Sequence, residues 1–229
     1  MNARSRRPLS LVANLCAGLL AILPAGPAAQ EADLAALLNR AVVRHQTGDL
    51  EGAAALYEQI LRAAPHAARI RSNLGAVYSQ LGRYDEAIGH YRRALEGGLE
   101  PEEGLAVRQN LAVGLFKTGR YDQAAEQARQ VLIAQPGNRD TLVVLADSYL
   151  RLGENQRAVD LLSPVAAASP DDKAVAYMLG TALLNLDRTG DAQIVMDRVF
   201  RDDSPEGHVL LATMHIKRLD YAQAEAELV

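Results

Sequence analysis

The sequence predicts an all-α protein in which a helix-turn-helix unit is repeated along the chain. Hydrophobic residues make up 49% of the 229 residues, but aromatic residues make up only 4% and tryptophan is absent. The interior must therefore be built mainly from Ala, Leu and Val, and alanine-rich sequences favour helix. Within residues 68–101, two groups of small and apolar residues are separated by Gly82. This arrangement predicts two amphipathic helices joined by a tight turn.

The same pattern occurs six times. Its marker is the alanine of the second helix, which recurs at spacings of 34, 37, 34, 34 and 32 residues as Ala53, Ala87, Ala124, Ala158, Ala192 and Ala224. The copies are residues 34–67, 68–101, 105–138, 139–172, 173–204 and 205–229, the last incomplete. The turn glycine recurs in four copies, as Gly48, Gly82, Gly119 and Gly153, and is replaced by Asp187 and Leu219 in the last two.

Copy two carries the residues of a known family. Leu74, Gly75 and Tyr78, then Ala87 and Tyr91, then a closing proline resemble the tetratricopeptide repeat, a unit of 34 residues. The aromatic residue usual at the fourth place of the unit is missing from every copy. The resemblance covers residues 34–229 and implies a right-handed α-solenoid, whose copies are stabilised by stacking on their neighbours. It also implies a scaffold that binds a protein or a peptide.

Small residues define where the two helices of a unit cross. The eighth place of each copy is Ala or Gly and the twentieth is Ala, because larger side chains would push the helix axes apart. Between copies two and three the chain has three extra residues, around Gly97, Gly98 and 102–104. We expect them to form a longer loop between helices.

Residues 1–29 have the layout of a secretory signal peptide. Three arginines precede an apolar run from Leu9 to Leu23, and small residues follow up to Ala29. The run is shorter than the roughly 20 residues of a membrane span, so we expect an exported, periplasmic or extracellular protein. An uncleaved anchor in the inner membrane is the alternative. Cys16 is the only cysteine and lies in this run, so the remainder of the chain has no thiol for disulfides or metal binding.

Charge argues against nucleic acid as a partner. Without the three leader arginines, 21 of the 24 basic residues remain against 28 acidic ones, a formal charge of −7. Binding to phosphate backbones depends on Lys and Arg, which are in the minority here.

The resemblance implies that places two, five, six, nine and twelve of each first helix line a concave groove. The sixth place is asparagine in three copies and apolar in the next three: Asn39, Asn73, Asn110, Val144, Met178 and Leu210. An amide can pair with the backbone of an extended peptide, because it offers both an acceptor and donors. We therefore predict a polar N-terminal half that binds peptide backbone and an apolar C-terminal half that binds side chains; the alternative is that the asparagines cap or bridge neighbouring helices. Further groove candidates are Arg69, Ser72, Gln109, Phe116 and Tyr177.

No catalytic or metal-binding pattern is found in the sequence. The five histidines include no pair at the i, i+4 spacing of a helical metal site. The family's dicarboxylate clamp needs a basic residue at the fifth place of the first copy, where this chain has Leu38. We therefore predict no enzyme activity, no cofactor and no small-molecule substrate.

Two functions fit these observations. The first is an adaptor of the cell envelope that binds a partner protein or extended peptide. The second is the substrate-recruiting region of a longer enzyme, of the glycosyl- or sulfotransferase type, that continues past Val229. Ala224 and Leu228 present an apolar face near the end of the chain, where solenoids generally need a polar cap. We expect the natural chain to continue or this end to dock, including onto a second copy.

Overall fold

The computed structural model describes residues 27–199, 205–217 and 219–228. The predicted leader ends at residue 29, in the first turn of the first helix, while Cys16 and the apolar run lie outside the described residues. The described residues form twelve helices in six pairs: α1 (Pro27–Gln46) with α2 (Leu50–Ala63), α3 (Ala68–Gln80) with α4 (Tyr84–Glu96), α5 (Pro101–Lys117) with α6 (Tyr121–Ala134), α7 (Arg139–Arg151) with α8 (Asn155–Ala168), α9 (Lys173–Asn185) with α10 (Thr189–Val199), and α11 (Pro205–Lys217) with α12 (Tyr221–Ala226).

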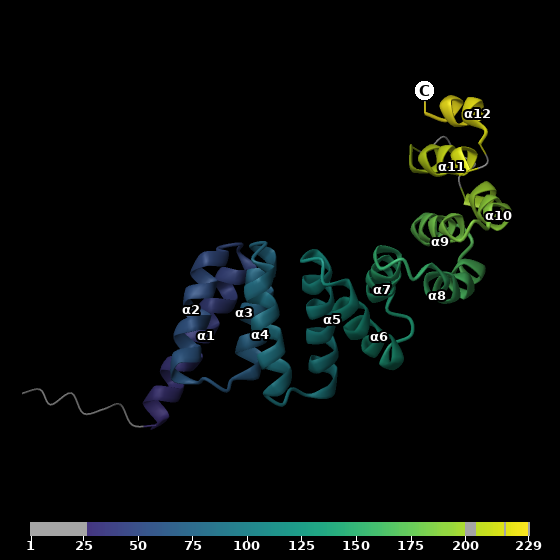
Figure 1. Ribbon diagram of the computed structural model, residues 1–229. Helices are drawn as coiled ribbons and strands as arrows, with labels where there is room; N and C mark the ends of the chain where they lie inside the picture. The colour runs from purple at the N-terminus through teal and green to yellow at the C-terminus, as the bar shows by residue number, and fades with distance from the viewer. Residues whose placement is uncertain (1–26, 200–204, 218, 229) are drawn as a thin grey trace, which may run out of the picture.

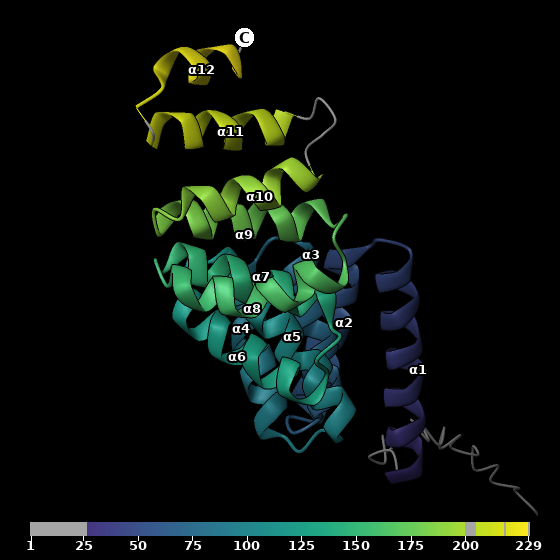
Figure 2. The same cartoon turned by 90° about the vertical axis from the view of Figure 1, so that its right-hand side faces the viewer.

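The pairs stack in sequence order into a solenoid that curves along its length, with α1 and α12 at opposite ends (Figure 1). Turned by 90°, the same stack shows α9 to α12 layered above α7 and α8 (Figure 2). The predicted all-α, right-handed solenoid of helix-turn-helix repeats is confirmed. Within the described ranges, no helix is both long and apolar enough to cross a membrane.

Turns between paired helices share one backbone conformation. Gly82 has φ +74°, and the other three turn glycines have φ between +73° and +82°. Glycine adopts this left-handed conformation without the steric penalty that a Cβ brings. Asp187 and Leu219, which replace the glycine, keep the same conformation, with φ 57° and 62°. The turn geometry is therefore retained where the preferred residue is lost.

Close helix crossing explains the small residues. The alanines at the twentieth place are buried, from 0% to 4% exposed. A Cβ built on Gly75 would lie 2.7 Å from Cε1 of Tyr91, which belongs to the partner helix α4. No side chain fits there while the tyrosine ring keeps its place, so the glycine is fixed by packing and not by its φ.

The expected longer loop between copies two and three is wrong. The segment between α4 and α5 runs only from residue 97 to 100, as short as the 64–67 and 135–138 segments between other pairs. The extra residues instead lengthen α5, which has 17 residues where α3 and α7 have 13. Pro101 starts that helix, and Glu102 and Glu103 follow in its first turn. Proline is pre-organised for the first helical position, and carboxylates there are favoured by the helix dipole.

The buried side chains form two clusters that meet in copy three. The first cluster is built from α1 to α6 and contains Tyr57, Tyr78 and Tyr91. The second extends from α5 to α11 and is mostly aliphatic, with Met196 and Met214 in its later part. Helix α5 contributes Leu111 to the first cluster and Ala112 to the second, so the two cores are continuous through this helix.

Exposed ion pairs also join successive copies near their turns. Arg120 lies 2.6 Å from Asp85 of the preceding copy, and Arg83 lies 3.8 Å from Glu51 in the same relative position. Such exposed pairs contribute about 0–1 kcal/mol each, so hydrophobic stacking remains the main source of stability.

Candidate protein-interaction surfaces

The first helices of successive copies form a continuous wall. Helix α3 contacts α5, α5 contacts α7, α7 contacts α9, and α9 contacts α11. With 3.6 residues per turn, places two, five, six, nine and twelve of each copy fall on one side of these helices, and places four, seven and eleven fall on the opposite side. We call the first set the first-helix face. It brings the sixth-place candidates of copies two to six onto neighbouring helices, whereas Asn39 lies on α1, which packs against α2.

The three asparagines have different surroundings. Asn39 and Asn110 are exposed, and neither forms a side-chain hydrogen bond with another residue in the described part of the chain. Asn73 is half-buried, and its amide faces the hydroxyl of Tyr57 on α2. Burial raises the pKa of Tyr57, and the hydrogen bond from Asn73 offsets part of that rise. Asn73 therefore lies toward α2, whereas the amides of Asn39 and Asn110 are exposed.

Arg69 and Gln109 are occupied by contacts with the start of the following first helix. Nε of Arg69 lies 2.8 Å from a carboxylate oxygen of Glu103. Oε1 of Gln109 accepts a hydrogen bond of 3.1 Å from Nδ2 of Asn138, whose Oδ1 caps α7 by accepting from the backbone N–H of Thr141. Each side chain thus joins its own first helix to the start of the next one, α3 to α5 and α5 to α7, which gives it a structural role.

The C-terminal part of the first-helix face is apolar. Val144 is half-buried and Met178 is 8% exposed, whereas Tyr177 beside it is 38% exposed. Leu210 lies in α11, and its side chain is outside the described residues. Val209 and Ile216 on the same helix are 50% and 48% exposed. The later copies thus expose hydrocarbon at places five and twelve of the face, whereas copies one and three expose an amide at place six.

A second set of surfaces lies on the opposite side, between successive second helices. Open furrows of about 440, 470 and 270 Å³ lie between α4 and α6, between α6 and α8, and between α8 and α10. Their floors come from the same places of the intervening first helix, namely Leu111 and Leu115, then Leu145 and Tyr149, then Leu179 and Leu183. The furrows are therefore a repeated feature of the stack.

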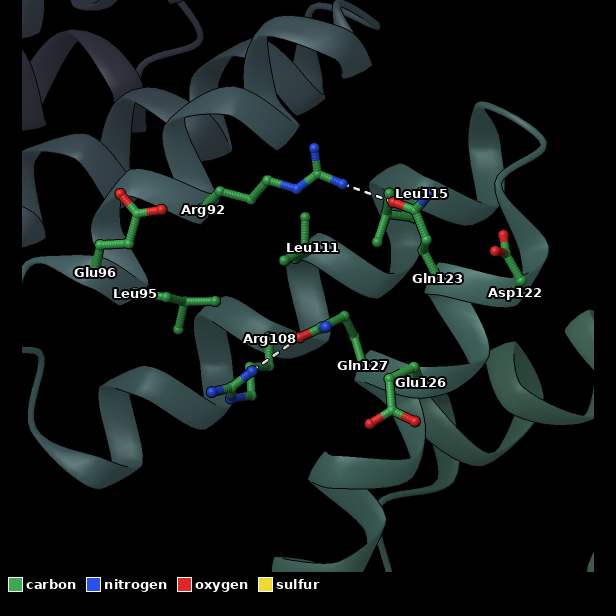
Figure 3. Close-up of a pocket in the computed structure, with 10 residues that line it drawn as sticks. All are labelled: Arg92, Leu95, Glu96, Arg108, Leu111, Leu115, Asp122, Gln123, Glu126 and Gln127. Carbon is green, nitrogen blue, oxygen red and sulfur yellow. Dashed lines mark hydrogen bonds between the residues drawn. The ribbon is translucent and has the colours of Figure 1, made fainter.

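One hydrogen bond crosses the furrow between α4 and α6, and a second joins its floor helix α5 to α6 (Figure 3). Arg92 donates to Oε1 of Gln123 at 2.6 Å, and Arg108 donates to Oε1 of Gln127 at 2.9 Å. Glu126, on the same helix as the two glutamines, has its pKa lowered by hydrogen bonds from Gln130 and Arg129. The furrow is therefore polar at its walls and apolar at its floor.

The corresponding position between α2 and α4 is filled by side chains. The ring of Tyr78 stacks on His90 at 5.5 Å, and its hydroxyl donates to Glu58. Burial and the neighbouring Glu58 raise the pKa of Tyr78 to about 12. Arg83 lies 4.4 Å above the same ring. The second-helix surfaces were not predicted from the sequence, although the fourth-place arginines, Arg71 and Arg108, mark the side of the helix that lines them.

Among the residues that the structure describes, no group of three or more His, Cys, Asp or Glu side chains is placed to hold a metal ion. The arrangement offers hydrogen bonds, charge and apolar area, which are the elements of protein recognition.

Comparison with known proteins agrees with this architecture. A curated relative, the Vi polysaccharide export protein VexE of Salmonella typhi, is 35% identical over 107 residues, which are 45% of this chain and 16% of that protein. The human protein O-mannosyl-transferase TMTC1 is 28% identical over 140 residues, 61% of this chain and 15% of its own length. The matches thus span about a sixth of each relative.

Similar solved structures include MamA, with a TM-score of 0.66 and 15% identity over 83% of this chain and 94% of that one. YrrB, described as a TPR protein with an unusual peptide-binding site, has a TM-score of 0.65 and 18% identity over 83% of this chain and 89% of its own. At these identities the likeness shows the fold alone. Family models of the tetratricopeptide repeat match residues 33–100, 66–135 and 115–179, which together are more than half of the sequence. The chain therefore belongs to the tetratricopeptide repeat family.

Proposed function

We propose that this protein is a non-catalytic scaffold that binds a partner protein, or an extended segment of one, across its first-helix face. The observation that carries the proposal is the contrast between exposed amides in the early copies and exposed hydrocarbon in the later ones. Asn110 offers an amide to a peptide backbone, while Tyr177, Val209 and Ile216 offer apolar contacts to side chains. Tetratricopeptide repeats are protein-interaction scaffolds, which supports the class of function.

The proposed location is the cell envelope, outside the cytoplasm or anchored to the inner membrane. The leader-like residues 1–29 support export, and the likeness to VexE, a polysaccharide export protein, supports an envelope role. Fold-level likeness supports a class of function, here binding to a protein of the envelope.

Site-specific photocrosslinking in cells tests the binding face. A photoreactive residue at Asn110 or Tyr177 is expected to form an adduct with a partner protein. The matched control is Arg93, an exposed residue of α4 on the second-helix side. Adducts from Arg93 but from neither first-helix position would contradict the proposal.

Variants of Asn73 and Asn110 distinguish a role in binding from a role in stability. Asn73→Ala is expected to lower the free energy of unfolding by about 1 kcal/mol, because it removes a half-buried amide beside Tyr57, and to leave crosslinking from Tyr177 unchanged. Asn110→Ala is expected to leave the free energy of unfolding unchanged and to lower the yield of the adduct formed from Tyr177. Chemical denaturation and adduct yield measure the two effects, and an Asn110→Ala protein that is destabilised but still captures its partner would place both amides in structural roles.

A second candidate is the substrate-recruiting region of a longer enzyme. The match to TMTC1, a protein O-mannosyl-transferase, favours it. That match covers 15% of the length of TMTC1. An antibody raised against this chain tests it by immunoblotting. A band far above 24.7 kDa would support the longer enzyme, and a band at or below that mass would exclude it.

A further inference from the structure

Helix α8 has a proline in its interior. Pro164 is the tenth of its 14 residues, and in the described helices no other proline lies beyond the first turn. Proline has no N–H to donate to the carbonyl of Asp160, one turn earlier, and its ring crowds that carbonyl, which kinks or weakens a helix. The hydroxyl of Ser163 donates to the carbonyl of Val159 at 2.7 Å, and such bonds also bend helices. The sequence therefore makes α8 less rigid than the second helices of copies one to three.

Helix α7 brings two hydroxyls into the core of the same copy. Thr141 and Ser148 are the only buried polar residues that the structure describes, at 1% and 0% exposure. The Thr141 hydroxyl has no hydrogen-bond partner there, whereas the copies before and after bury Val107 and Val175 at its place. Ser148 donates to the carbonyl of Val144 on its own helix at 2.6 Å. A buried hydroxyl without a partner opposes packing, and one that bonds within its own helix does not join two helices.

Helix α8 packs more extensively against α9 than against its own partner α7. In copies one to three the order is the reverse, because each second helix packs most extensively against the first helix of its own copy. Side-chain hydrogen bonds join the paired helices of copies two and three, between Ser79 and Tyr91 and from Arg108 to Gln127. Among the residues that the structure describes, no side-chain hydrogen bond joins α7 to α8. The interface between α7 and α8 is therefore the loosest of those between the paired helices of copies one to four.

Open space between α6 and α8 leaves room for movement at this interface. The furrow of about 470 Å³ and a second hollow of about 170 Å³ lie between these helices, and both are lined by Arg129, Tyr149 and Arg157. The first helices stay in contact, since α7 packs on α9 and Arg139 at the start of α7 lies 2.6 Å from Asp172, the N-cap of α9. The stack also turns here, because α1 to α8 run across the view in Figure 1 and α9 to α12 rise from them. A rotation about the α7–α9 contact can therefore widen or narrow the space between α6 and α8.

We propose that copy four is a hinge, on which the unit α8 to α12 pivots against the unit α1 to α7 about the contact between α7 and α9. Each unit keeps its own packing, because α7 packs extensively on α6 and α8 packs extensively on α9. The motion changes the separation of Asn110 and Tyr177, which lie on α5 and α9, and so adapts the span of the first-helix face to its partner. That last consequence rests on the proposed function, whereas the hinge itself does not.

Double electron–electron resonance between two spin labels tests the hinge. The full chain carries Cys16→Ser, so that labels attach only to introduced cysteines. Gln130→Cys on α6 with Ile194→Cys on α10 spans the hinge, whereas Gln59→Cys on α2 with Gln130→Cys lies within one unit. Each pair joins second helices that are two copies apart, and the replaced side chains are exposed or half-buried. The distance distribution of the α6–α10 pair is expected to be about twice as broad as that of the α2–α6 pair.

Replacing two residues that loosen copy four tests the cause. Pro164→Gln introduces the glutamine that copies one and three have at this place, and Thr141→Val introduces the valine of copies three and five. Together they are expected to narrow the α6–α10 distribution to the width of the α2–α6 distribution. The control is Pro170→Gln, in the segment between α8 and α9, which is expected to change neither width.

Circular dichroism verifies that every variant is folded. Equal widths for the two pairs without these changes, no narrowing by the double variant, or equal narrowing by the control would overturn the inference. The crosslinking experiment reports separately on the proposed function, because it depends on the native partner and not on the motion of copy four.

Discussion

The N-terminal and C-terminal halves hold the same backbone unit with different side chains. At the twenty-fourth place of each copy, the first two copies bury Tyr57 and Tyr91, whereas copies four and five bury Leu162 and Met196. The early turns use glycine, while the last two use Asp187 and Leu219 in the same left-handed conformation. The repeat therefore requires close helix packing and a left-handed turn, and tolerates several residues that provide them.

The first way to test this contrast is to remove the large side chain at the twenty-fourth place. Tyr91→Ala is expected to lower the free energy of unfolding by about 3–5 kcal/mol, because the ring is 1% exposed and leaves a large cavity. Leu162→Ala, its counterpart in copy four, is expected to have a smaller effect, about 2–4 kcal/mol. Urea denaturation of both variants measures the difference, and equal losses would show that the two cores are not distinct.

The second prediction concerns the glycine that faces this tyrosine. Gly75→Ala is expected to destabilise the protein by about 1–3 kcal/mol, because its Cβ would meet the ring of Tyr91. In the Tyr91→Ala background the same change is expected to be neutral or stabilising, since alanine favours helix by about 1 kcal/mol over glycine. Gly89→Ala is the control, because no heavy atom lies within 4 Å of the position that its Cβ would take, and it is expected to stabilise. Additive effects of the Gly75 and Tyr91 changes would contradict direct packing.

The third prediction compares turns of the two halves. Gly82→Ala is expected to cost about 1 kcal/mol, because alanine must adopt a positive φ there. Leu219→Gly is expected to stabilise the α11–α12 pair by roughly 0.5–1 kcal/mol, because Leu219 has the same strained φ and is 73% exposed, so little packing is lost. Hydrogen exchange analysed by mass spectrometry measures the change in local stability of each helix pair. Faster exchange in the Leu219→Gly variant would mean that this side chain has a packing role.

The fourth prediction is a pH dependence confined to the N-terminal half. Burial lowers the pKa of His90, and Arg71 and Arg93 lower it further, whereas Glu58 and Glu86 oppose the shift. Its Nδ1 is buried and has no hydrogen-bond partner among the described residues. The unfolded chain therefore binds the proton more readily, so stability is retained above about pH 6.5 and falls as the pH drops through the lowered pKa of the folded state.

His90→Phe keeps a ring against Tyr78 and removes this titration. The variant is expected to lose less stability than the unaltered protein between about pH 6.5 and pH 5. Thermal unfolding followed by circular dichroism across this range measures it. Parallel curves for the two proteins would assign the pH dependence to other groups.

Much of the fold could be predicted because it depends on residues close together in sequence. The adjacent Leu74 and Gly75, followed by Gly82 and Ala87, predict one pair of helices joined by a turn. The same residue types at the same spacing in the other copies predict that such pairs stack. The length of α5 could not be read in this way. The three extra residues could extend a loop or a helix, and the helix start at Pro101 decided between them.

The candidate site was predictable only in part. The sequence identified the sixth-place register, with its change from Asn110 to Val144, because helical periodicity places those residues on one face. The separate roles of the candidate residues depend on contacts between helices. Asn73 faces Tyr57 and Arg69 pairs with Glu103, whereas Asn110 has no such contact and is exposed. Repetition in the sequence thus determined the scaffold and the register of its faces. The tertiary structure decided which side chains are occupied and which are free, because each of these contacts joins different helices, and their relative positions are set by packing of the whole stack.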